Sequence, residues 1–306
     1  MKILAMVLAG GEGTRLYPLT AAHAKPALPF AQGYRIVDFV LSNLVNSGIS
    51  RIHILAQYKP HSLVAHIRTA WAPWSGGTQP AMNVVLPETV SAAGTYKGTA
   101  DAVFKNLRLI ECERPDLVAI FAADHVYRMD VRQMARFHEE RGAEVSIAAV
   151  PVPVAQASAF GIVAAGSAGE LRDFQEKPER PMPIATDPGR AYASMGNYLF
   201  DPRVLRELLE HAMRRGHTDF GHHILPQLPG VRRAFAYDFA SNRIPGVRDY
   251  EEQGYWRDIG TVAAYRAAQR DVQGATPRFN LANAKWPIRG GAYVGNAWPA
   301  PLPAMA

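Results

Sequence analysis

The sequence contains one cysteine, Cys112, among its 306 residues. A lone thiol cannot form an internal disulfide or a cysteine-rich metal cluster, so both kinds of framework are excluded. We expect Cys112 to lie at the end of a helix and to act as a packing residue. No apolar stretch approaches the roughly 18 residues that span a bilayer, and the apolar run over residues 2–9 is too short for a secretion signal. The sequence therefore predicts a cytoplasmic protein with no membrane partner.

The sequence also lacks a concentrated block of one charge. Its 33 lysine and arginine residues and 27 acidic residues give a formal net charge of +6. The basic residues are scattered among acidic ones, and no nucleic-acid-binding module is recognisable, which disfavours a nucleic-acid partner. A pocket for acidic small molecules such as phosphates accounts better for the excess positive charge.

A glycine-rich loop follows directly after the apolar run over residues 2–9, in the order Gly10-Gly11-Glu12-Gly13-Thr14-Arg15-Leu16. Glycines let backbone N–H groups approach phosphate oxygens, and Arg15 adds a positive charge. A P-loop would need Gly-Lys-Ser/Thr, and a dinucleotide-binding loop would need a glycine or alanine in place of Leu16. The loop therefore predicts a third kind of site for a nucleoside triphosphate, with an ordinary glycine-rich turn as the alternative.

Strand-like and helical segments alternate along the chain, which predicts an α/β fold. The strand-like segments are Arg51–Ala56, Met82–Leu86, Leu117–Ala122, Glu144–Pro151, Glu170–Phe174, Ala193–Phe200 and Arg233–Phe239. Helical spacing covers Tyr34–Asn46, which Gly48 ends, and Thr99–Cys112. Near-continuous apolar strands indicate a mainly parallel sheet covered on both faces, whose ligands gather at the carboxyl ends of its strands.

Asp124 comes just after the predicted strand Leu117–Ala122, where its carboxylate would point into the ligand crevice. Mg²⁺ prefers one or two carboxylates together with substrate phosphates and water, so a second acidic residue is needed nearby. Asp258 is the candidate, and the alternative interpretation is a carboxylate near a helix N-terminus beside Thr261. The pair predicts a Mg²⁺ site.

Glu176 and Lys177 stand together at a strand end that Pro178 stops. Neighbouring residues of an extended strand point to opposite faces, so both reach one ligand only if the chain bends there. Glu176 would then accept hydroxyl hydrogens and Lys177 would bind a phosphate, whereas an exposed polar strand end is the alternative. Residues 94–101 are likewise either a helix N-terminus that binds an anion or an ordinary capped helix.

Together these segments resemble a known family. Residues 10–15, 96–102, 123–125, 176–178, 194–197 and 256–260 occur in the order seen in sugar-nucleotide pyrophosphorylases. Residues 24–27, 35–43, 57–63 and 286–289 narrow the resemblance to the bacterial glucose-1-phosphate adenylyltransferases. The resemblance extends from Met1 to about Gly290.

The resemblance implies a Rossmann-like nucleotidyltransferase domain with a mainly parallel mixed sheet, which we expect over residues 1–277. Residues 278–306 are then expected to form a linker-like tail where the family's left-handed β-helix would begin. No hexapeptide repeat is visible in this tail, so we expect that β-helix to be missing. Because that domain helps to form the family's tetramer and effector site, a homo-oligomer remains only one possibility.

The resemblance also implies the reaction and the residues that perform it. The adenylyl group of ATP would be transferred to glucose 1-phosphate, giving ADP-glucose and pyrophosphate for glycogen synthesis. The expected catalytic residues are Arg15, Asp124, Lys177 and Asp258, with Asp124 and Asp258 as the Mg²⁺ ligands. The expected nucleotide-binding residues are Gly10, Gly11, Gly13, Thr14, Arg15, Lys25 and Gly98, and Lys25 also resembles a lysine that contacts activators. The expected glucose-1-phosphate-binding residues are Tyr96, Gly161, Glu176, Lys177 and Ser194.

Two alternatives remain open from the sequence. One is uridylyl or thymidylyl transfer to a hexose 1-phosphate, because residues 86–90 lack the glutamine-bearing segment that faces the base in bacterial relatives. The other is a non-catalytic regulatory subunit of a full-length relative. The presence of all four expected catalytic residues argues against the second alternative.

Overall fold

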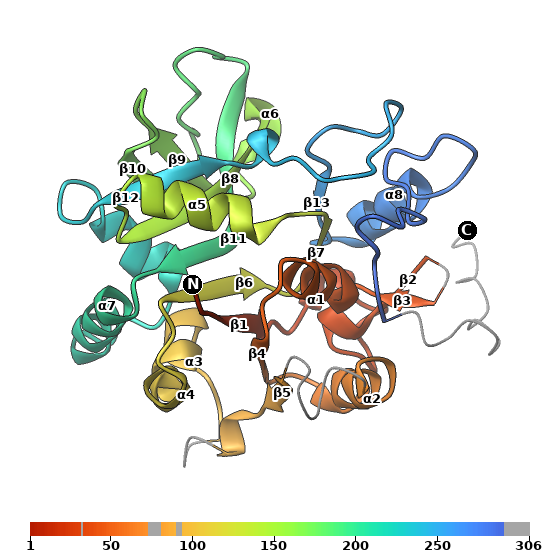
Figure 1. Ribbon diagram of the computed structural model, residues 1–306, viewed down its shortest axis with the longest axis horizontal. Helices are drawn as coiled ribbons and strands as arrows, with labels where there is room; N and C mark the ends of the chain where they lie inside the picture. The colour runs from red at the N-terminus through yellow and green to blue at the C-terminus, as the bar shows by residue number, and fades with distance from the viewer. Residues whose placement is uncertain (32, 73–80, 90–93, 291–306) are drawn as a thin grey trace.

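Strand β1 (Ile3–Ala9) lies at the centre of a mixed sheet in this computed structural model, which describes residues 1–31, 33–72, 81–89 and 94–290 (Figure 1). Within these residues the sheet has nine strands, in the order β10-β9-β11-β6-β1-β4-β5, with β8 and β12 continuing from β11. The other strands are β4 (Arg51–Ala56), β5 (Ala81–Val85), β6 (Leu117–Ala122), β8 (Val145–Pro153), β9 (Gly161–Ala165), β10 (Leu171–Glu176), β11 (Arg190–Phe200) and β12 (Ala234–Asp238).

The sheet has a parallel half and a largely antiparallel half. Strand β1 pairs in parallel with both β4 and β6, and β4 pairs in parallel with β5. Strand β11 runs antiparallel to β6, β8 and β9, while β12 runs parallel to β8. The predicted α/β fold with a mixed sheet is therefore confirmed. The chain leaves β1 in one direction for β4 and β5 and returns on the other side as β6, which creates a switch point where ligands of such sheets bind.

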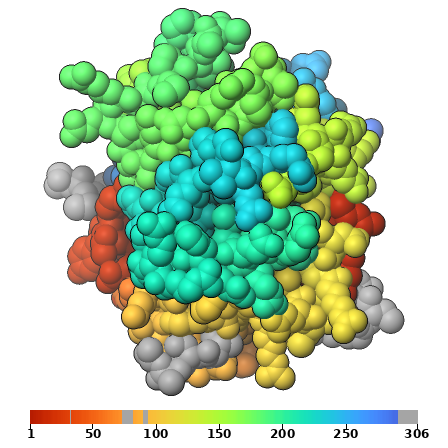
Figure 2. Space-filling view, turned by 90° about the vertical axis from the view of Figure 1, so that its left-hand side faces the viewer, coloured from red at the N-terminus to blue at the C-terminus, as the bar shows by residue number. Residues whose placement is uncertain are grey.

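Alternating side chains of β1 pack into different layers on the two faces of the sheet. Ala5 and Val7 belong to a buried cluster with helices α1, α2 and α5, whereas Leu4 and Met6 belong to another with α3, α4 and α7. This follows from the two-residue period of a strand. The helices are α1 (Val37–Asn46), α2 (Pro60–Ala70), α3 (Thr99–Lys105), α4 (Leu107–Glu113), α5 (Val131–Glu140), α6 (Val154–Ala157), α7 (Pro202–Arg214) and α8 (Val262–Asp271). Figure 2 shows α7 and the segment after it across the middle of one face, above the golden helices α3 and α4.

Two short ribbons lie beyond the carboxyl ends of β1 and β6, on the right of Figure 1. Strand β7 (His125–Tyr127) pairs antiparallel with β13 (Trp256–Asp258), and β2 (Pro29–Phe30) pairs with β3 (Tyr34–Arg35). A further buried cluster joins them to α1 and α8 through Phe30, Phe39, Val126, Ile259 and Phe279. This cluster fixes the ribbons against the main sheet.

Most predicted strands match the structure, and two strands, Arg51–Ala56 and Leu117–Ala122, match to the residue. The predicted helix Thr99–Cys112 is wrong in one respect, because it is divided at Asn106. The Asn106 side chain donates to the carbonyl of Ala102 and to the hydroxyl of Tyr96. Such side-chain bonds compete with continuous helical geometry. The predicted helix Tyr34–Asn46 begins later, at Val37, because Tyr34 and Arg35 form β3.

Cys112 lies in α4 and is exposed. The prediction that it is a packing residue is therefore wrong. Helix α4 buries Leu107 and Ile110, which lie on the opposite side of the helix from Cys112 in the three-to-four-residue spacing. Its position near a helix end is confirmed.

Residues just beyond the predicted domain boundary at 277 pack against α1. The side chains of Phe279, Trp286 and Ile288 are buried. The Ser42 hydroxyl accepts from the Arg289 amide, and the Asn46 side chain donates to the carbonyl of Pro287. The boundary and the predicted tail over residues 278–306 stay predictions, and residues 291–306 lie outside the described residues. In the part of the chain that the structure describes, no helix is long and apolar enough to cross a bilayer.

Asn43 joins α1 to the β7 ribbon and to this C-terminal segment. Its side chain is fully buried, donates to the Tyr127 carbonyl and accepts from the Met129 amide. The indole of Trp286 also donates to it, at 3.3 Å. Removing this side chain would leave several buried polar groups without a partner.

We expect Asn43→Ala to lower the free energy of unfolding by about 2–4 kcal/mol, measured by urea denaturation. Asn46→Ala, one turn on in the same helix, removes a bond to the Pro287 carbonyl and a weak 3.4 Å bond from Arg289 at a half-buried position, and should cost less than about 1 kcal/mol. Equal losses in the two variants would show that the buried network around Asn43 contributes nothing special.

Candidate active site

A cavity of about 500 Å³ lies at the carboxyl ends of β1 and β6. It contains residues from both halves of the sheet and from the connecting loops. Among the predicted site residues, those that line it are Gly10, Gly11, Tyr96, Gly98, Asp124, Glu176 and Lys177. The structure therefore brings together residues that the sequence places far apart.

The glycine-rich loop begins where β1 ends. Gly10 and Gly11 line the cavity, while Gly13 takes a left-handed conformation, with φ of 70°, and starts a single turn over Thr14–Leu16. Arg15 is exposed on this turn, and its guanidinium lies beside Gly260, 3.6 Å from where a Cβ on that glycine would stand. Gly13, Thr14 and Arg15 therefore lie beside the cavity lining, next to the segment that carries Asp258.

The two predicted metal ligands are neighbours. Asp124 follows β6 and precedes β7, and Asp258 ends β13. The antiparallel register sets Asp258 opposite His125, and the amide of Ile259 reaches the carbonyl of Asp124. Thr261, rather than Asp258, caps α8 by accepting from the Ala264 amide. The geometry thus favours the ligand interpretation of Asp258 over the helix-terminus interpretation.

Lys25 lies between these carboxylates. Its Nζ is 2.6 Å from Oδ2 of Asp124 and 3.3 Å from Oδ1 of Asp258. Burial alone would lower the pKa of Lys25, but the two carboxylates outweigh burial and raise it. Burial likewise favours a higher pKa for Asp124, but Lys25 and His125 lower that pKa to about 2. Both groups are therefore charged at neutral pH, and Lys25 is buried, with 8% of the residue exposed.

A divalent cation fits the donor atoms around this pair. Asp124, Asp258 and His125 each offer a ligand atom, and these atoms all lie within 4.8 Å of one another. Nε2 of His125 is 3.5 Å from Asp124 and 3.6 Å from Asp258. Carboxylate oxygens are the protein ligands that Mg²⁺ prefers, and imidazole suits several transition metals. The arrangement therefore supports a divalent metal site.

The predicted bend at Glu176 and Lys177 is present. Lys177 has a left-handed backbone, with φ of 47°, and both side chains line the cavity, with Nζ of Lys177 3.0 Å from Oε1 of Glu176. Two glycines make room for the Glu176 carboxylate. A Cβ on Gly161 would lie 2.9 Å from its Oε2, and one on Gly221 would lie 2.5 Å from it. Gly161 thus leaves the space that the Glu176 carboxylate occupies.

The segment around Tyr96 and Gly98 contributes to the cavity wall. Two amides of the first turn of α3, from Ala100 and Asp101, both donate to the carbonyl of Thr218. The Asp101 carboxylate accepts from the Lys97 amide. The capped-helix interpretation is therefore the one that the structure supports.

Sequence reasoning missed several residues of the cavity wall, among them Gln57, Tyr198, Asp219 and Phe220. Ser194 does not line the cavity itself; its hydroxyl accepts from the Gly196 amide and lies 3.5 Å from that of Tyr198. Burial raises the pKa of Tyr198, so its hydroxyl stays protonated. Asp219 caps the turn over Phe220–Ile224. The only sequence signal for Tyr198 is that it carries a hydroxyl near the end of an otherwise apolar strand. That signal is weak.

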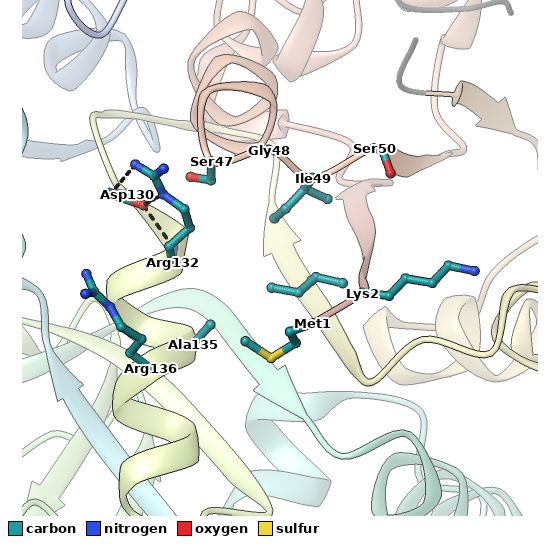
Figure 3. A pocket seen from close by; sticks show the side chains of 11 residues that line it. Met1, Lys2, Ser47, Gly48, Ile49, Ser50, Asp130, Arg132, Ala135 and Arg136 are labelled. Carbon is teal, nitrogen blue, oxygen red and sulfur yellow. Dashed lines mark hydrogen bonds and ion pairs between the residues drawn. The ribbon is translucent and has the colours of Figure 1, made fainter. Parts of the chain in front are cut away.

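A second cavity, of about 600 Å³, lies between the start of β1, the end of α1 and the start of α5 (Figure 3). Arg132 on its wall is bound to Asp130 through two side-chain hydrogen bonds of 2.8 Å. This second cavity shares no lining residue with the predicted site and lies at the amino ends of β1 and β4. Ligands of parallel sheets bind at the opposite edge, so the cavity beside Asp124 is the candidate active site.

Comparison with known proteins agrees with this geometry. The sequence model of the nucleotidyl transferase family matches residues 4–274. The chain belongs to the nucleotidyl transferase family. The match begins in β1 and ends just after α8, so it includes every residue of the candidate active site.

Within the nucleotidyl transferase family, the chain is similar to proteins named glucose-1-phosphate adenylyltransferase. It is 49% identical over 295 residues to the protein of that name from Thermodesulfovibrio yellowstonii, covering 96% of this chain and 72% of the relative. The protein of the same name from Mycobacterium ulcerans is 47% identical over 290 residues, which cover 94% of this chain and 71% of the relative. The protein of the same name from Anaeromyxobacter is 47% identical over 293 residues, which cover 94% of this chain and 70% of the relative.

Proposed function

We propose that the protein is an adenylyltransferase that converts ATP and glucose 1-phosphate into ADP-glucose and pyrophosphate, for glycogen or another α-glucan. The observation that carries this proposal is the convergence, in one cavity, of the glycine-rich loop, Asp124 and the Glu176–Lys177 pair, with Lys25 and Asp258 clustered around Asp124. Relatives at 47–49% identity carry the name of this activity.

The nucleotide binds on the β1 side of the cavity. Gly10 and Gly11 present backbone that a phosphate can approach closely. Arg15, which belongs to the glycine-rich loop, and Lys25, which contacts Asp124 and Asp258, bind the triphosphate by charge. Asp124 and Asp258 would hold Mg²⁺, which would supply positive charge to offset the negative charge of the nucleotide's phosphates.

The sugar phosphate binds on the side of the antiparallel half of the sheet. Glu176 accepts hydrogen bonds from sugar hydroxyls, and Lys177 binds the phosphate. The Lys177 side chain is 54% exposed, so it has room to turn toward a ligand. Tyr96 and Tyr198 lie on the wall of the same cavity and enclose the sugar ring.

The reaction is an in-line displacement. A phosphate oxygen of glucose 1-phosphate attacks the α-phosphorus of ATP, and the bond to the pyrophosphate oxygen breaks. Because the nucleophile is already an anion, no general base is needed. Catalysis then rests on holding two polyanions in line and on balancing the charge that moves to pyrophosphate. Arg15, Lys25 and Lys177 supply that positive charge from the protein.

Pyrophosphate release tests this function directly. The purified protein should release pyrophosphate with Mg²⁺, glucose 1-phosphate and ATP, and only weakly when UTP, dTTP, GTP or CTP replaces ATP. Faster release with UTP or dTTP would assign a sister reaction instead. No pyrophosphate release with any of the five nucleotides would favour a non-catalytic subunit.

Two charge-removing substitutions should separate the metal site from the sugar-phosphate site. Asp124→Asn should abolish turnover by weakening metal binding, whereas Lys177→Ala should raise KM for glucose 1-phosphate about tenfold or more with a smaller effect on kcat. Steady-state kinetics over both substrates measures the difference. Asp249→Asn and Lys285→Ala, two exposed charges away from the cavity, serve as matched controls. The assigned roles are wrong if both site variants change only affinity.

Gly161→Ala should displace the Glu176 carboxylate. The new Cβ would lie 2.6 Å from Cζ of Phe174 and 2.9 Å from Oε2 of Glu176, which requires a shift. We expect KM for glucose 1-phosphate to rise several-fold to about tenfold while KM for ATP stays unchanged. Gly189→Ala, whose Cβ meets only an ordinary 3.6 Å contact, is the control. An equal rise for ATP would contradict a sugar-side role for this glycine.

A further inference from the structure

The Lys25 ammonium lies between the two carboxylates, Asp124 and Asp258, that would hold a divalent cation. The Lys25 ammonium contacts carboxylate oxygens of both Asp124 and Asp258, at 2.6 and 3.3 Å. A divalent cation that uses the same two carboxylates must come about 2.1 Å from their oxygens. An ammonium and a metal ion cannot both use the same two oxygens, Oδ2 of Asp124 and Oδ1 of Asp258.

The backbone and Cβ of Lys25 lie beside the glycine-rich loop. Its backbone lies in a short turn over Lys25–Ala27, and the residue is 8% exposed. Its Cβ lies 3.3 Å from where a Cβ on Gly13 would stand, so the stem of the side chain runs beside the glycine-rich loop. From this stem the ammonium reaches the carboxylates on one side, and the loop that faces the nucleotide lies on the other.

Charge also favours the ammonium when no ligand is bound. Asp124 and Asp258 carry two negative charges in a half-buried site, and such a pair repels strongly unless a cation lies close by. Lys25 leaves a net charge of about −1 on the three groups at neutral pH, which is a poor attraction for a divalent ion that must lose water.

We propose that Lys25 is an internal cation that takes the place of the metal between Asp124 and Asp258 until a metal–nucleotide complex binds. The free protein then binds divalent cations weakly. The nucleotide's phosphates give Lys25 a new anionic partner, and the carboxylates become available to the metal that arrives with them. Lys25 thereby sets the order in which metal and nucleotide enter. This inference rests on the proposed function for the nucleotide that displaces Lys25.

Binding of Mn²⁺ to the nucleotide-free protein tests the proposal. Free Mn²⁺ is measured by electron paramagnetic resonance for the native chain and for Lys25→Met. We expect the native chain to bind Mn²⁺ weakly and Lys25→Met to bind it about tenfold or more tightly, because the competing ammonium is gone. Lys25→Gln, whose amide still donates to the carboxylates, is a second neutral variant and should bind Mn²⁺ more tightly than the native chain. Lys25→Arg keeps the charge and should bind as weakly as the native chain.

Two further variants locate the effect. Adding Asp124→Asn to Lys25→Met should remove the gained Mn²⁺ binding. Lys105→Met breaks another ion pair, 2.8 Å from Asp101, and should leave Mn²⁺ binding unchanged. Thermal unfolding gives an independent readout: the melting temperature of Lys25→Met should be lower than that of the native chain in chelator and should rise more on addition of Mn²⁺.

The proposal is overturned if neither neutral variant binds Mn²⁺ more tightly than the native chain, or if the gained binding survives Asp124→Asn. It is also overturned if the native, nucleotide-free chain binds Mn²⁺ as tightly as Lys25→Met. None of these measurements contains a nucleotide or a sugar. Their failure is therefore distinct from a failure of the proposed function, which pyrophosphate release decides.

Discussion

The antiparallel pairing of β7 with β13 is the contact on which the candidate active site depends. Strand β7 follows β6 almost directly, whereas β13 comes from the far end of the catalytic fold, and their register sets Asp258 opposite His125. This brings two carboxylates into one half-buried place, where they repel each other. The buried ammonium of Lys25 offsets that repulsion. A backbone ladder thus fixes the negative charges, while a side chain on a flexible stem balances them.

In the proposed function, each half of the sheet would serve one of the two substrates. The parallel half ends in the glycine-rich loop and Asp124, where charge and close backbone suit a triphosphate. The antiparallel half supplies Glu176, Lys177 and Tyr198, which suit a sugar phosphate. Strand β11 pairs with β6 and thereby joins the halves. In the proposed function, this continuous ladder would hold both substrates in one frame, which is what an in-line displacement between two anions requires.

Local signals in the sequence were sufficient for much of this structure. The apolar run before Gly10 and the strand before Asp124 were predictable because buried parallel strands have an unmistakable composition. Pairings between distant segments were not: no local pattern shows that β13 returns to β7, or that Lys25 reaches both carboxylates. The division of the helix at Asn106 depends on a hydrogen bond to Tyr96, a tertiary contact. Exposure of Cys112 depends equally on which side of α4 meets the sheet.

Lys177 shows how stability and function oppose each other at one residue. A left-handed backbone costs a non-glycine residue roughly 1 kcal/mol or more, and glycine would avoid that cost. Glycine, however, would remove the ammonium from the cavity. The fold holds the strained conformation by a backbone bond of 3.1 Å from the Lys177 amide to the Phe160 carbonyl. Strain of this kind persists only where the surrounding structure fixes it, and here it turns two adjacent side chains, Glu176 and Lys177, toward the same cavity.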